Sequence, residues 1–470
     1  MADRDYTYYD FTLSLCPHCL RRVDAKVVFR GDEVLMLKRC PEHGRQEVVI
    51  ADDIDYYRLC REFLKPGTLP RHFHTATEHG CPYDCGLCPD HEQHSCLTLV
   101  EITERCNLTC PTCYAESSPR AGRHRSLAEV EAMLDAVVRS EGEPDVVQLS
   151  GGEPTIHPEF FAIVDAAKAR PIQHLMINTN GLRIAQDPGF AERLAEYAPG
   201  FEIYLQFDSL REEPLRRLRG RDLRDTRLRA LERLNALNLS TTLVVTLQKG
   251  LNDDEIGDIL DFARRQPCVR GVTFQPTQIA GRTDGFDPGR DRLTMTGVRR
   301  AILEQSDLFT ADDLIPVPCN PDALVMGYAL KLGEELVPLT HLLRPADLLQ
   351  AGNSIAYEEE PRLQELLRGH LLDLFSTGTP VDRASERFKQ ILCCLPKIDV
   401  PGLGYDNLFR VIIMRFIDAY DFDVRAIKRS CVHIVGDDLR LYPFETMNLF
   451  YRGQAQRERL VELRHPGARR

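Results

Sequence analysis

Three closely spaced cysteines place the tightest constraint on what this chain can fold into. Cys106, Cys110 and Cys113 form a Cys-x-x-x-Cys-x-x-Cys run directly after an apolar segment, 97–103 (LTLVEIT), that predicts a buried strand. Three thiolates can hold three irons of a 4Fe–4S cluster and leave the fourth iron open to a ligand. The alternatives are a zinc site, which would need a fourth ligand, and three buried apolar thiols.

The segment from residue 97 to about residue 281 alternates strand-like and helical stretches. Expected strands are 97–103, 146–150, 175–178, 203–207, 242–246 and 271–275, and expected helices include 126–139 and 226–238. In the second helix we expect Leu228, Leu231 and Leu234 to share one core-facing side. Regular alternation predicts parallel strands covered by outer helices, with the chemistry at the carboxyl ends of the strands.

The second expected strand ends in Gly151-Gly152-Glu153-Pro154. With the preceding cysteine run, this order resembles the radical S-adenosylmethionine (SAM) superfamily, although Thr112 stands where many members have an aromatic residue. The resemblance implies an α/β fold with a partial six-strand (β/α) barrel. It also implies that the open iron chelates SAM, whose reductive cleavage gives a 5′-deoxyadenosyl radical that removes hydrogen from an unactivated carbon.

Polar residues at three strand ends are candidate SAM-binding groups. By resemblance, Gly151-Gly152-Glu153-Pro154 contacts the SAM amino group, with Glu153 facing the ammonium and the glycines allowing close approach. Asn178 and Asn180 end the third strand, and Gln206 and Asp208 end the fourth, where they suit ribose hydroxyls and an adenine edge. The alternative is that all of them are ordinary turn-forming residues.

Two later stretches are weaker candidates. Gln275 and residues 279–282 resemble the late barrel segment that packs on adenine. Residues 211–224 hold an arginine run that predicts a solvated face, or alternatively a basic patch that steers an anionic substrate.

The N-terminal segment predicts a separate metal module. Cys16-Pro-His-Cys19 and Cys40-Pro-Glu-His43 flank residues 26–37, which read as two strands joined by a turn at 30–32. Two knuckles around a hairpin describe a rubredoxin-like or zinc-ribbon module that holds a mononuclear iron or zinc. Its fourth ligand could be His43 or Cys60; the alternative is two turns that merely carry cysteines.

A second Cys-x-x-x-Cys-x-x-Cys run, Cys81, Cys85 and Cys88, lacks the strand and the Gly-Gly-Glu-Pro that accompany Cys106. We therefore expect it to bind an auxiliary cluster. Its missing ligand could be the nearby Cys96 or a cysteine from the C-terminal region.

Four segments together resemble the tetraether lipid synthase family, earlier described as pterin-methylating radical enzymes. They are 16–44, 80–88, 315–319 (IPVPC) and 430–452, which runs from SCVH to PFETMNLFYR. The resemblance implies two auxiliary 4Fe–4S clusters and a mononuclear iron. On that view Cys81, Cys85, Cys88, Cys319 and Cys431 are auxiliary-cluster ligands, and Cys393-Cys394 either complete the set or are buried thiols.

These features divide the chain into five parts. We expect a rubredoxin-like module at 1–66, an auxiliary-cluster segment at 67–96, the radical SAM barrel at 97–300, a helix-rich auxiliary-cluster and substrate region at 301–455, and a basic tail at 456–470. Residues 325–330 and 409–416 could line an apolar tunnel in the helix-rich region, or simply form core.

Composition excludes several classes of function. A net charge of −12 argues against nucleic acid as a partner. The N-terminus predicts no secretory signal, and no apolar run reaches transmembrane length. Sixteen cysteines then indicate metal ligation in a reducing cytoplasm. Peripheral membrane contact is compatible with a lipid substrate.

The leading hypothesis is radical C–C bond formation between unactivated alkyl carbons of lipid chains, with a cellular electron donor. The alternative is cobalamin-independent radical methylation of a pterin-like or other small substrate. A third hypothesis, an electron-transfer protein without turnover, is disfavoured because an electron carrier needs no cofactor pocket.

Overall fold

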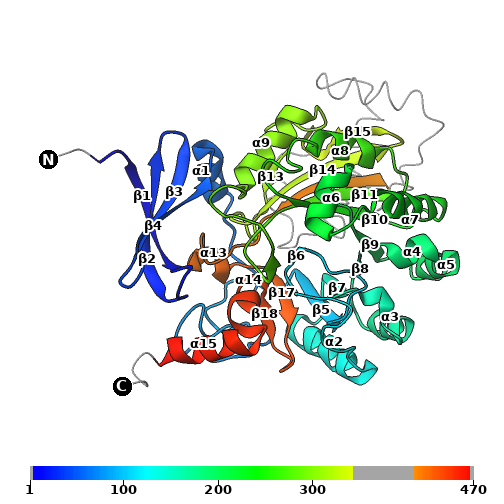
Figure 1. The fold of residues 1–470 in the computed structure, drawn as a ribbon, viewed down its shortest axis with the longest axis horizontal. Helices are drawn as coiled ribbons and strands as arrows, with labels where there is room; N and C mark the ends of the chain where they lie inside the picture. The colour runs from blue at the N-terminus through cyan, green and yellow to red at the C-terminus, as the bar shows by residue number, and fades with distance from the viewer. Residues whose placement is uncertain (1–3, 342–406, 466–470) are drawn as a thin grey trace, which may run out of the picture.

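The computed structural model describes residues 4–341 and 407–465. A small N-terminal sheet stands beside α13 and α15 of the C-terminal region, and a large twisted sheet with outer helices forms the rest (Figure 1). The predicted α/β architecture with a parallel sheet is confirmed. Within the described ranges, no helix is long and apolar enough to cross a membrane.

The N-terminal module is an antiparallel sheet whose strands pair in chain order, β1-β2-β3-β4. Its bounds are β1 Thr7–Leu15, β2 Arg22–Arg30, β3 Glu33–Cys40 and β4 Gly44–Ala51, followed by α1 Ile54–Glu62. The predicted hairpin is confirmed, with Arg30 opposite Glu33. Asp53 caps α1 by accepting a hydrogen bond from the Tyr56 amide (2.9 Å).

All six predicted barrel strands are present. Their bounds are β5 Leu97–Thr103, β7 Val146–Gly151, β8 His174–Thr179, β9 Phe201–Gln206, β10 Thr241–Leu247 and β11 Val269–Pro276. They lie in the spatial order β11-β10-β9-β8-β7-β5, and each pairs in parallel with its neighbour. Their runs of β-branched and apolar residues suit strands that are buried on both faces.

Helices connect these strands and lie on the outside of the sheet (Figure 1). They are α2 Leu127–Glu141, α3 Phe160–Lys168, α4 Leu182–Gln186, α5 Pro188–Ala195, α6 Glu212–Arg219, α7 Arg224–Ala236, α8 Ile256–Arg264 and α9 Met295–Gln305. A capping box between Ser126 and Glu129 starts α2. In α7, Leu231 and Leu234 are buried as predicted, but Leu228 is 49% exposed, because Ala230 and Arg227 occupy the inner face instead.

The C-terminal region contributes strands to the same sheet, which the sequence did not predict. β16 (Leu408–Met414) pairs in parallel with β11, and β17 (Val432–Val435) pairs in parallel with β5. Residues 325–330 and 409–416, expected among helices, thus lie mainly in strands β14 and β16. The boundary predicted at residue 300 therefore runs through one sheet, and the five-part division stays a prediction.

The remaining elements complete the two edges of this sheet and the mouth of the barrel. They are β6 Thr112–Cys113, η1 Pro154–Ile156, β12 Arg282–Thr283, β13 Ile315–Pro316, β14 Leu324–Leu332, β15 Glu335–Pro338, η2 Leu339–His341, α13 Val424–Lys428, β18 Leu441–Pro443, α14 Phe444–Thr446, η6 Met447–Tyr451 and α15 Gln454–Arg464. Cys393 and Cys394 lie outside the described residues.

Candidate active site

One cavity is lined by residues at the carboxyl ends of the barrel strands. It encloses about 1270 Å³ of empty space, part of it open to solvent. Cys106, Cys110 and Cys113 all line this cavity. The loop that carries them follows β5 directly, so the strand fixes where the thiols stand. The structure thus brings the three predicted cluster ligands to a single wall.

The predicted Gly-Gly-Glu-Pro turn lies against the backbone of this cysteine loop. The Gly152 amide donates to the Thr103 carbonyl (2.7 Å), and the Glu153 amide donates to the Arg105 carbonyl (2.9 Å). A Cβ on Gly151 would lie 2.1 Å from the Thr103 oxygen, and one on Gly152 would lie 2.1 Å from the Arg105 oxygen. Glycine is therefore required here by the neighbouring protein backbone.

Glu153 lines the cavity, but most of its acceptor capacity is already used. Its Oε1 accepts hydrogen bonds from the Thr155 hydroxyl (2.6 Å) and the Thr179 hydroxyl (2.7 Å), and Oε2 accepts one from the Asn180 amide (2.8 Å). Burial raises the pKa of Glu153 against the effect of these bonds. Oε2 keeps room for a further donor. Pro154, the fourth residue of the turn, begins η1 and does not line the cavity.

The predicted strand-end residues form a hydrogen-bonded row across β8 and β9. The Gln206 side-chain amide donates to Asn178 Oδ1 (2.8 Å), and Gln206 Oε1 in turn accepts from Arg219 (3.1 Å). Asn180 donates to Asn107, next to Cys106 in the chain (2.7 Å). Asn178, Asn180 and Gln206 all line the cavity.

Asp208 lies behind this row and does not line the cavity. It is fully buried and holds Arg219 through two bonds, from Nε to Oδ2 (2.8 Å) and from Nη2 to Oδ1 (2.5 Å). Burial would raise the pKa of Asp208, but the Arg219 and Arg227 guanidinium groups lower it overall. Its position fits a role in placing Arg219 rather than in direct contact with a ligand.

Arg219 is a site residue that the sequence did not single out. Its neighbours in the run, Arg216 and Arg217, have side chains that are 59% and 51% exposed, whereas the Arg219 side chain is 12% exposed. Arg219 lines the cavity. Burial raises the pKa of Cys110, and the Arg219 charge offsets part of that rise. The one available signal was its position as the last residue before the glycine that ends α6.

The late barrel segment contacts the cysteine loop through strand pairing and side-chain hydrogen bonds. β12 pairs with β6, which places Arg282 opposite Cys113. The Arg282 side chain donates to the carbonyls of Cys110 (2.5 Å) and Ser117 (2.9 Å). Gln275 and Ala280 of this segment line the cavity, and their contact with adenine stays a prediction.

Burial shapes the chemistry of the Cys106 and Cys110 thiols. It raises the pKa of Cys106 to about 12, with Glu153 contributing in the same direction. A thiol whose pKa is raised this far stays protonated at neutral pH until a bound metal makes the thiolate form favourable. The donor set therefore fits a metal cluster better than a nucleophilic role.

The deep part of the cavity is largely apolar. Its lining includes Leu97, Leu99, Tyr204, Met414, Phe416, Val432 and Phe444. Phe416 and Phe444 stack on each other with centroids 4.0 Å apart. One amide interrupts this surface: Gln148 is buried, lines the cavity, and its Oε1 has no hydrogen-bond partner among the described residues.

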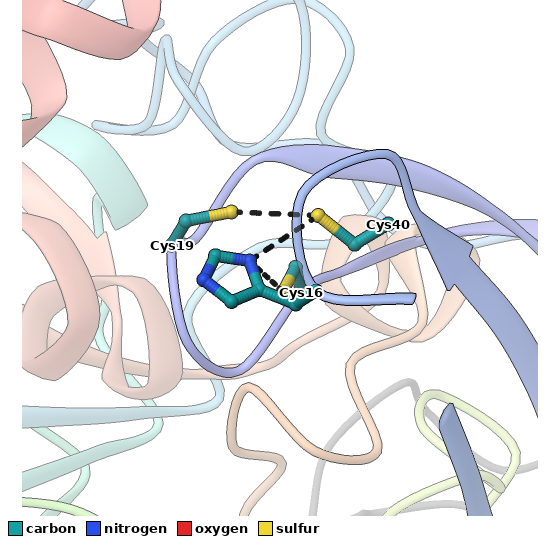
Figure 2. A group of neighbouring side chains, drawn as sticks. Cys16, Cys19 and Cys40 are labelled. Atoms are coloured by element: carbon teal, nitrogen blue, oxygen red, sulfur yellow. Dashed lines mark hydrogen bonds between the residues drawn. The ribbon is translucent and has the colours of Figure 1, made fainter. Parts of the chain in front are cut away.

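The N-terminal cysteines converge on a second, separate site. The ligand atoms of Cys16, Cys19, Cys40 and His43 all lie within 4.8 Å of one another. Figure 2 shows the three thiols around the imidazole, with Cys19 and Cys40 sulfurs 3.8 Å apart. His43 Nδ1 lies 3.5 Å from the Cys16 sulfur and 3.4 Å from the Cys40 sulfur. His43 is thus the better of the two predicted fourth ligands, since Cys60 is buried in the main core beside Tyr56.

The cysteines predicted to bind auxiliary clusters fall into two groups. Cys81, Cys85 and Cys88 line one small pocket, where Asp84 orders the loop by accepting from the Glu78 and Gly80 amides. Cys319 and Cys431 lie elsewhere and have Cys96 beside them. Cys96 is therefore placed with the C-terminal cysteines and not with the Cys81 run.

Comparison with known proteins identifies two parts of the chain. The model of the Radical SAM superfamily matches residues 100–263, and the model of the HMPTM N-terminal zinc ribbon domain matches residues 8–52. The chain is 28% identical over 495 residues to the 7,8-dihydro-6-hydroxymethylpterin dimethyltransferase of Methanocaldococcus jannaschii, covering 96% of each chain.

Other similarities are confined to parts of the chain. The GTP 3′,8-cyclase of Chlorobaculum tepidum is 30% identical over 203 residues, which cover 41% of this chain and 59% of the cyclase. SuiB of Streptococcus suis, solved with S-adenosylmethionine, aligns with a TM-score of 0.37 and 18% identity over 44% of this chain and 46% of SuiB. Residues 100–263 of this chain thus match the radical SAM superfamily, and a zinc ribbon at residues 8–52 precedes them.

Proposed function

We propose that this protein is a radical SAM enzyme in which Cys106, Cys110 and Cys113 hold a 4Fe–4S cluster. The observation that carries the proposal is that these thiols line the same cavity as Gly151, Gly152 and Glu153. When bound, the cluster and SAM would supply a 5′-deoxyadenosyl radical that removes hydrogen from a substrate carbon. The three cysteines leave one iron without a protein ligand, as this chemistry needs.

The surrounding side chains suit an amino acid and a nucleoside. The remaining acceptor site on Glu153 Oε2 can receive the SAM ammonium, while the Arg219 guanidinium offers a positive charge for the carboxylate and the cluster thiolates. Asn178 and Gln206 present amide groups to the ribose side of the cavity. Asp208 acts by holding Arg219 in place.

For the substrate we infer a pterin-like heterocycle that receives a methyl group without cobalamin. The full-length similarity to a pterin dimethyltransferase supports this inference. So does Gln148, because its unpaired Oε1 in an apolar wall offers an acceptor to a ring N–H group. A buried amide without a partner is costly, so a substrate donor at this position would gain binding energy.

A second candidate is coupling of alkyl chains, as in the tetraether lipid synthase family. The apolar lining from Leu97 and Leu99 to Phe416 and Phe444 favours it, since a hydrocarbon chain needs such a surface. Both reactions would form a carbon–carbon bond by a radical route. Both also need a cellular electron donor, and the Cys81 pocket is the site we propose for an auxiliary 4Fe–4S cluster.

Anaerobic turnover of the reconstituted full-length protein with product mass analysis tests the proposal. The protein is incubated with SAM and a strong reductant, in one arm with a dihydropterin and methylene-folate, and in another with dialkyl and diacyl glycerolipids. We expect 5′-deoxyadenosine together with a methylated pterin. A chain-joined lipid with two fewer hydrogens would favour the second candidate instead. If deoxyadenosine forms in neither arm, the assignment of the catalytic cysteines is wrong.

A Gln148→Leu variant separates the two candidates further. If Gln148 binds a ring N–H, its loss should raise the KM for the pterin by about 10-fold or more, the effect of about 1.4 kcal/mol of lost hydrogen bonding. Turnover of an alkyl substrate should be unchanged or improved. SAM cleavage without substrate is the control, since Gln148 is not among the SAM-facing residues.

A further inference from the structure

Three cysteines that are far apart in the sequence meet in the interior of the protein. The sulfur atoms of Cys96, Cys319 and Cys431 all lie within 4.8 Å of one another, and those of Cys319 and Cys431 are 3.9 Å apart. All three side chains are buried, with at most 2% exposure. Isolated buried thiols have no reason to gather in this way.

The spacing is that of ligands around a single metal ion. In a tetrahedral site with metal–sulfur bonds of about 2.3 Å, two sulfurs lie about 3.8 Å apart. The zinc ribbon of this same chain provides an internal standard, since its Cys19 and Cys40 sulfurs are 3.8 Å apart. Sulfurs this close together leave no room between them for a cubane of four irons and four sulfides.

The runs assigned to clusters differ in this respect. Among the described residues, neither Cys106, Cys110 and Cys113 nor Cys81, Cys85 and Cys88 form a group whose ligand atoms all lie within 4.8 Å. The wider arrangement is the one that a cluster requires. The close arrangement is shared only by the zinc ribbon and the Cys96 group among these four sets of cysteines.

A histidine lies beside one of the three thiols. His94 Nε2 lies 3.6 Å from the Cys96 sulfur. Its other ring nitrogen, Nδ1, lies 3.0 Å from Glu141 Oε2, a side chain that is 4% exposed. A carboxylate on the far nitrogen is the usual way in which proteins orient a metal-binding imidazole. The Asp145 carboxylate also lies within 4.8 Å of the ligand atoms of His94 and Cys96, which makes it the competing candidate.

His94 does not belong to the group that the three sulfurs form, so its imidazole must move toward Cys319 and Cys431 to complete a tetrahedron. We propose that Cys96, Cys319 and Cys431 form a second mononuclear site that binds Zn²⁺, with His94 as its fourth ligand. Glu141 does not bind the ion in this site; it orients the His94 imidazole through its contact with Nδ1. The proposal is independent of the substrate and of the radical reaction. It gives Cys319 and Cys431 a different role from the auxiliary-cluster ligation that the family resemblance implies.

The position of the site indicates a structural role. Cys96 directly precedes β5, and Cys431 directly precedes β17, the strand that pairs in parallel with β5. The Leu97 amide donates to the Cys431 carbonyl (3.1 Å), so the two strands are already joined at this point. Cys319 comes from the turn between β13 and β14. One ion would therefore tie together the start of the barrel and two segments of the C-terminal region.

Zinc content and zinc X-ray absorption test the proposal without reference to activity. Full-length protein from zinc-supplemented culture should hold two zinc ions per chain. Cys40→Ser, which removes a ribbon ligand, should leave one zinc, and its absorption spectrum should show three sulfurs at about 2.3 Å and one nitrogen at about 2.0–2.1 Å. Cys319→Ser should instead lose the other zinc and keep the ribbon zinc.

The fourth ligand is tested by a matched pair of variants. His94→Ala in the Cys40→Ser background should lose zinc, Glu141→Gln should weaken zinc affinity by about 10–100-fold in a chelator competition, and Asp145→Asn should retain it. Zinc loss in Asp145→Asn but not in His94→Ala would overturn the assignment of His94.

Two further results would overturn the site as a whole. One is a single zinc per chain in the unmutated protein. The other is loss of about four irons and four sulfides in Cys319→Ser, which would show a cluster there. If Cys319→Ser does not fold, the absorption spectrum of the Cys40→Ser protein still decides, because it needs no change at the proposed site.

Discussion

The zinc ribbon and the barrel loop each present three cysteines, but they differ in what completes the site. In the ribbon, His43 from the turn between β3 and β4 closes the set, and all four ligand atoms lie within 4.8 Å of one another. In the barrel, Cys106, Cys110 and Cys113 face a cavity, and their surroundings come from β7, β8, β9 and β12. A closed site stabilises a fold, whereas an open one can bind a substrate.

The two sites also differ in how far they depend on other segments of the chain. The ribbon ligands all lie between residues 16 and 43, so this short segment carries its own site. The barrel loop and the strand end before it accept hydrogen bonds from Gly152, Arg282 and Arg219, which belong to other parts of the barrel. We therefore expect substitutions in the barrel to reduce SAM cleavage far more than substitutions in the ribbon. The variants below are ordered from the largest expected effect to the smallest.

The largest effect is expected for Cys106→Ser. Serine is a poor ligand for iron, so the cluster should be lost and 5′-deoxyadenosine should fall below detection after anaerobic turnover. The control is Cys268→Ala, which changes a buried cysteine of the main core that belongs to no metal-ligand group among the described residues. Normal deoxyadenosine formation by Cys106→Ser would contradict the site.

Gly152→Ala should come next. Its new Cβ would lie 2.1 Å from the Arg105 oxygen, so the cysteine loop must shift, at a cost of about 1–3 kcal/mol. We expect about 5- to 100-fold weaker cluster retention, measured as iron and sulfide per chain after gel filtration. Gly189→Ala is the control, since its Cβ would meet Asp187 at an ordinary 3.5 Å. Equal iron content in Gly152→Ala and Gly189→Ala would show that close packing at Gly152 does not hold the cysteine loop in place.

A smaller effect is expected for Arg219→Lys. Lysine keeps the charge but loses the forked contact with Asp208 and Gln206, so SAM cleavage should fall by about 10–100-fold. The expected signature is a higher KM for SAM with the cluster still present by absorption spectroscopy. Arg216→Lys, on the exposed face of the same helix, should behave as the unmutated protein. Equal behaviour of the two variants would argue against a role for Arg219.

The smallest effect on SAM cleavage is expected for Cys40→Ser. It should remove the ribbon metal and lower the temperature at which the N-terminal sheet unfolds, because structural zinc contributes directly to folding. Deoxyadenosine formation at low temperature should be largely unchanged. Loss of cleavage in folded Cys40→Ser protein would mean that the two regions are coupled, and the comparison above would fail.

The sequence predicted local elements well because each rests on a local pattern. The apolar run 97–103 forms β5 with the predicted bounds, and Ser126 with Glu129 begins α2 through a capping box. Leu228 shows the limit of this approach. Its spacing fits the inner face of α7, yet Ala230 and Leu231 are buried there while Leu228 is exposed. Periodicity does not say which of two similar faces a neighbour will cover.

The candidate site was predictable where its residues lie in one motif or at strand ends. Cys106, Cys110, Cys113 and the Gly-Gly-Glu-Pro turn were identified on this basis, as were Asn178, Asn180 and Gln206. Arg219 was not identified, because its role depends on its burial beside Asp208. The sequence alone does not distinguish a buried arginine from an exposed one. Gln148 was missed because a single amide in a strand carries no spacing signal.

By itself the sequence determined the three cysteine motifs that lie within short segments and the alternation that builds the parallel sheet. These depend on neighbours a few residues apart. Only the tertiary structure decided that β16 and β17 extend the sheet, that Asp208 holds Arg219, and that Cys96 meets Cys319 and Cys431. Such contacts join segments separated by up to hundreds of residues, and chain packing, which no local pattern encodes, brings them together.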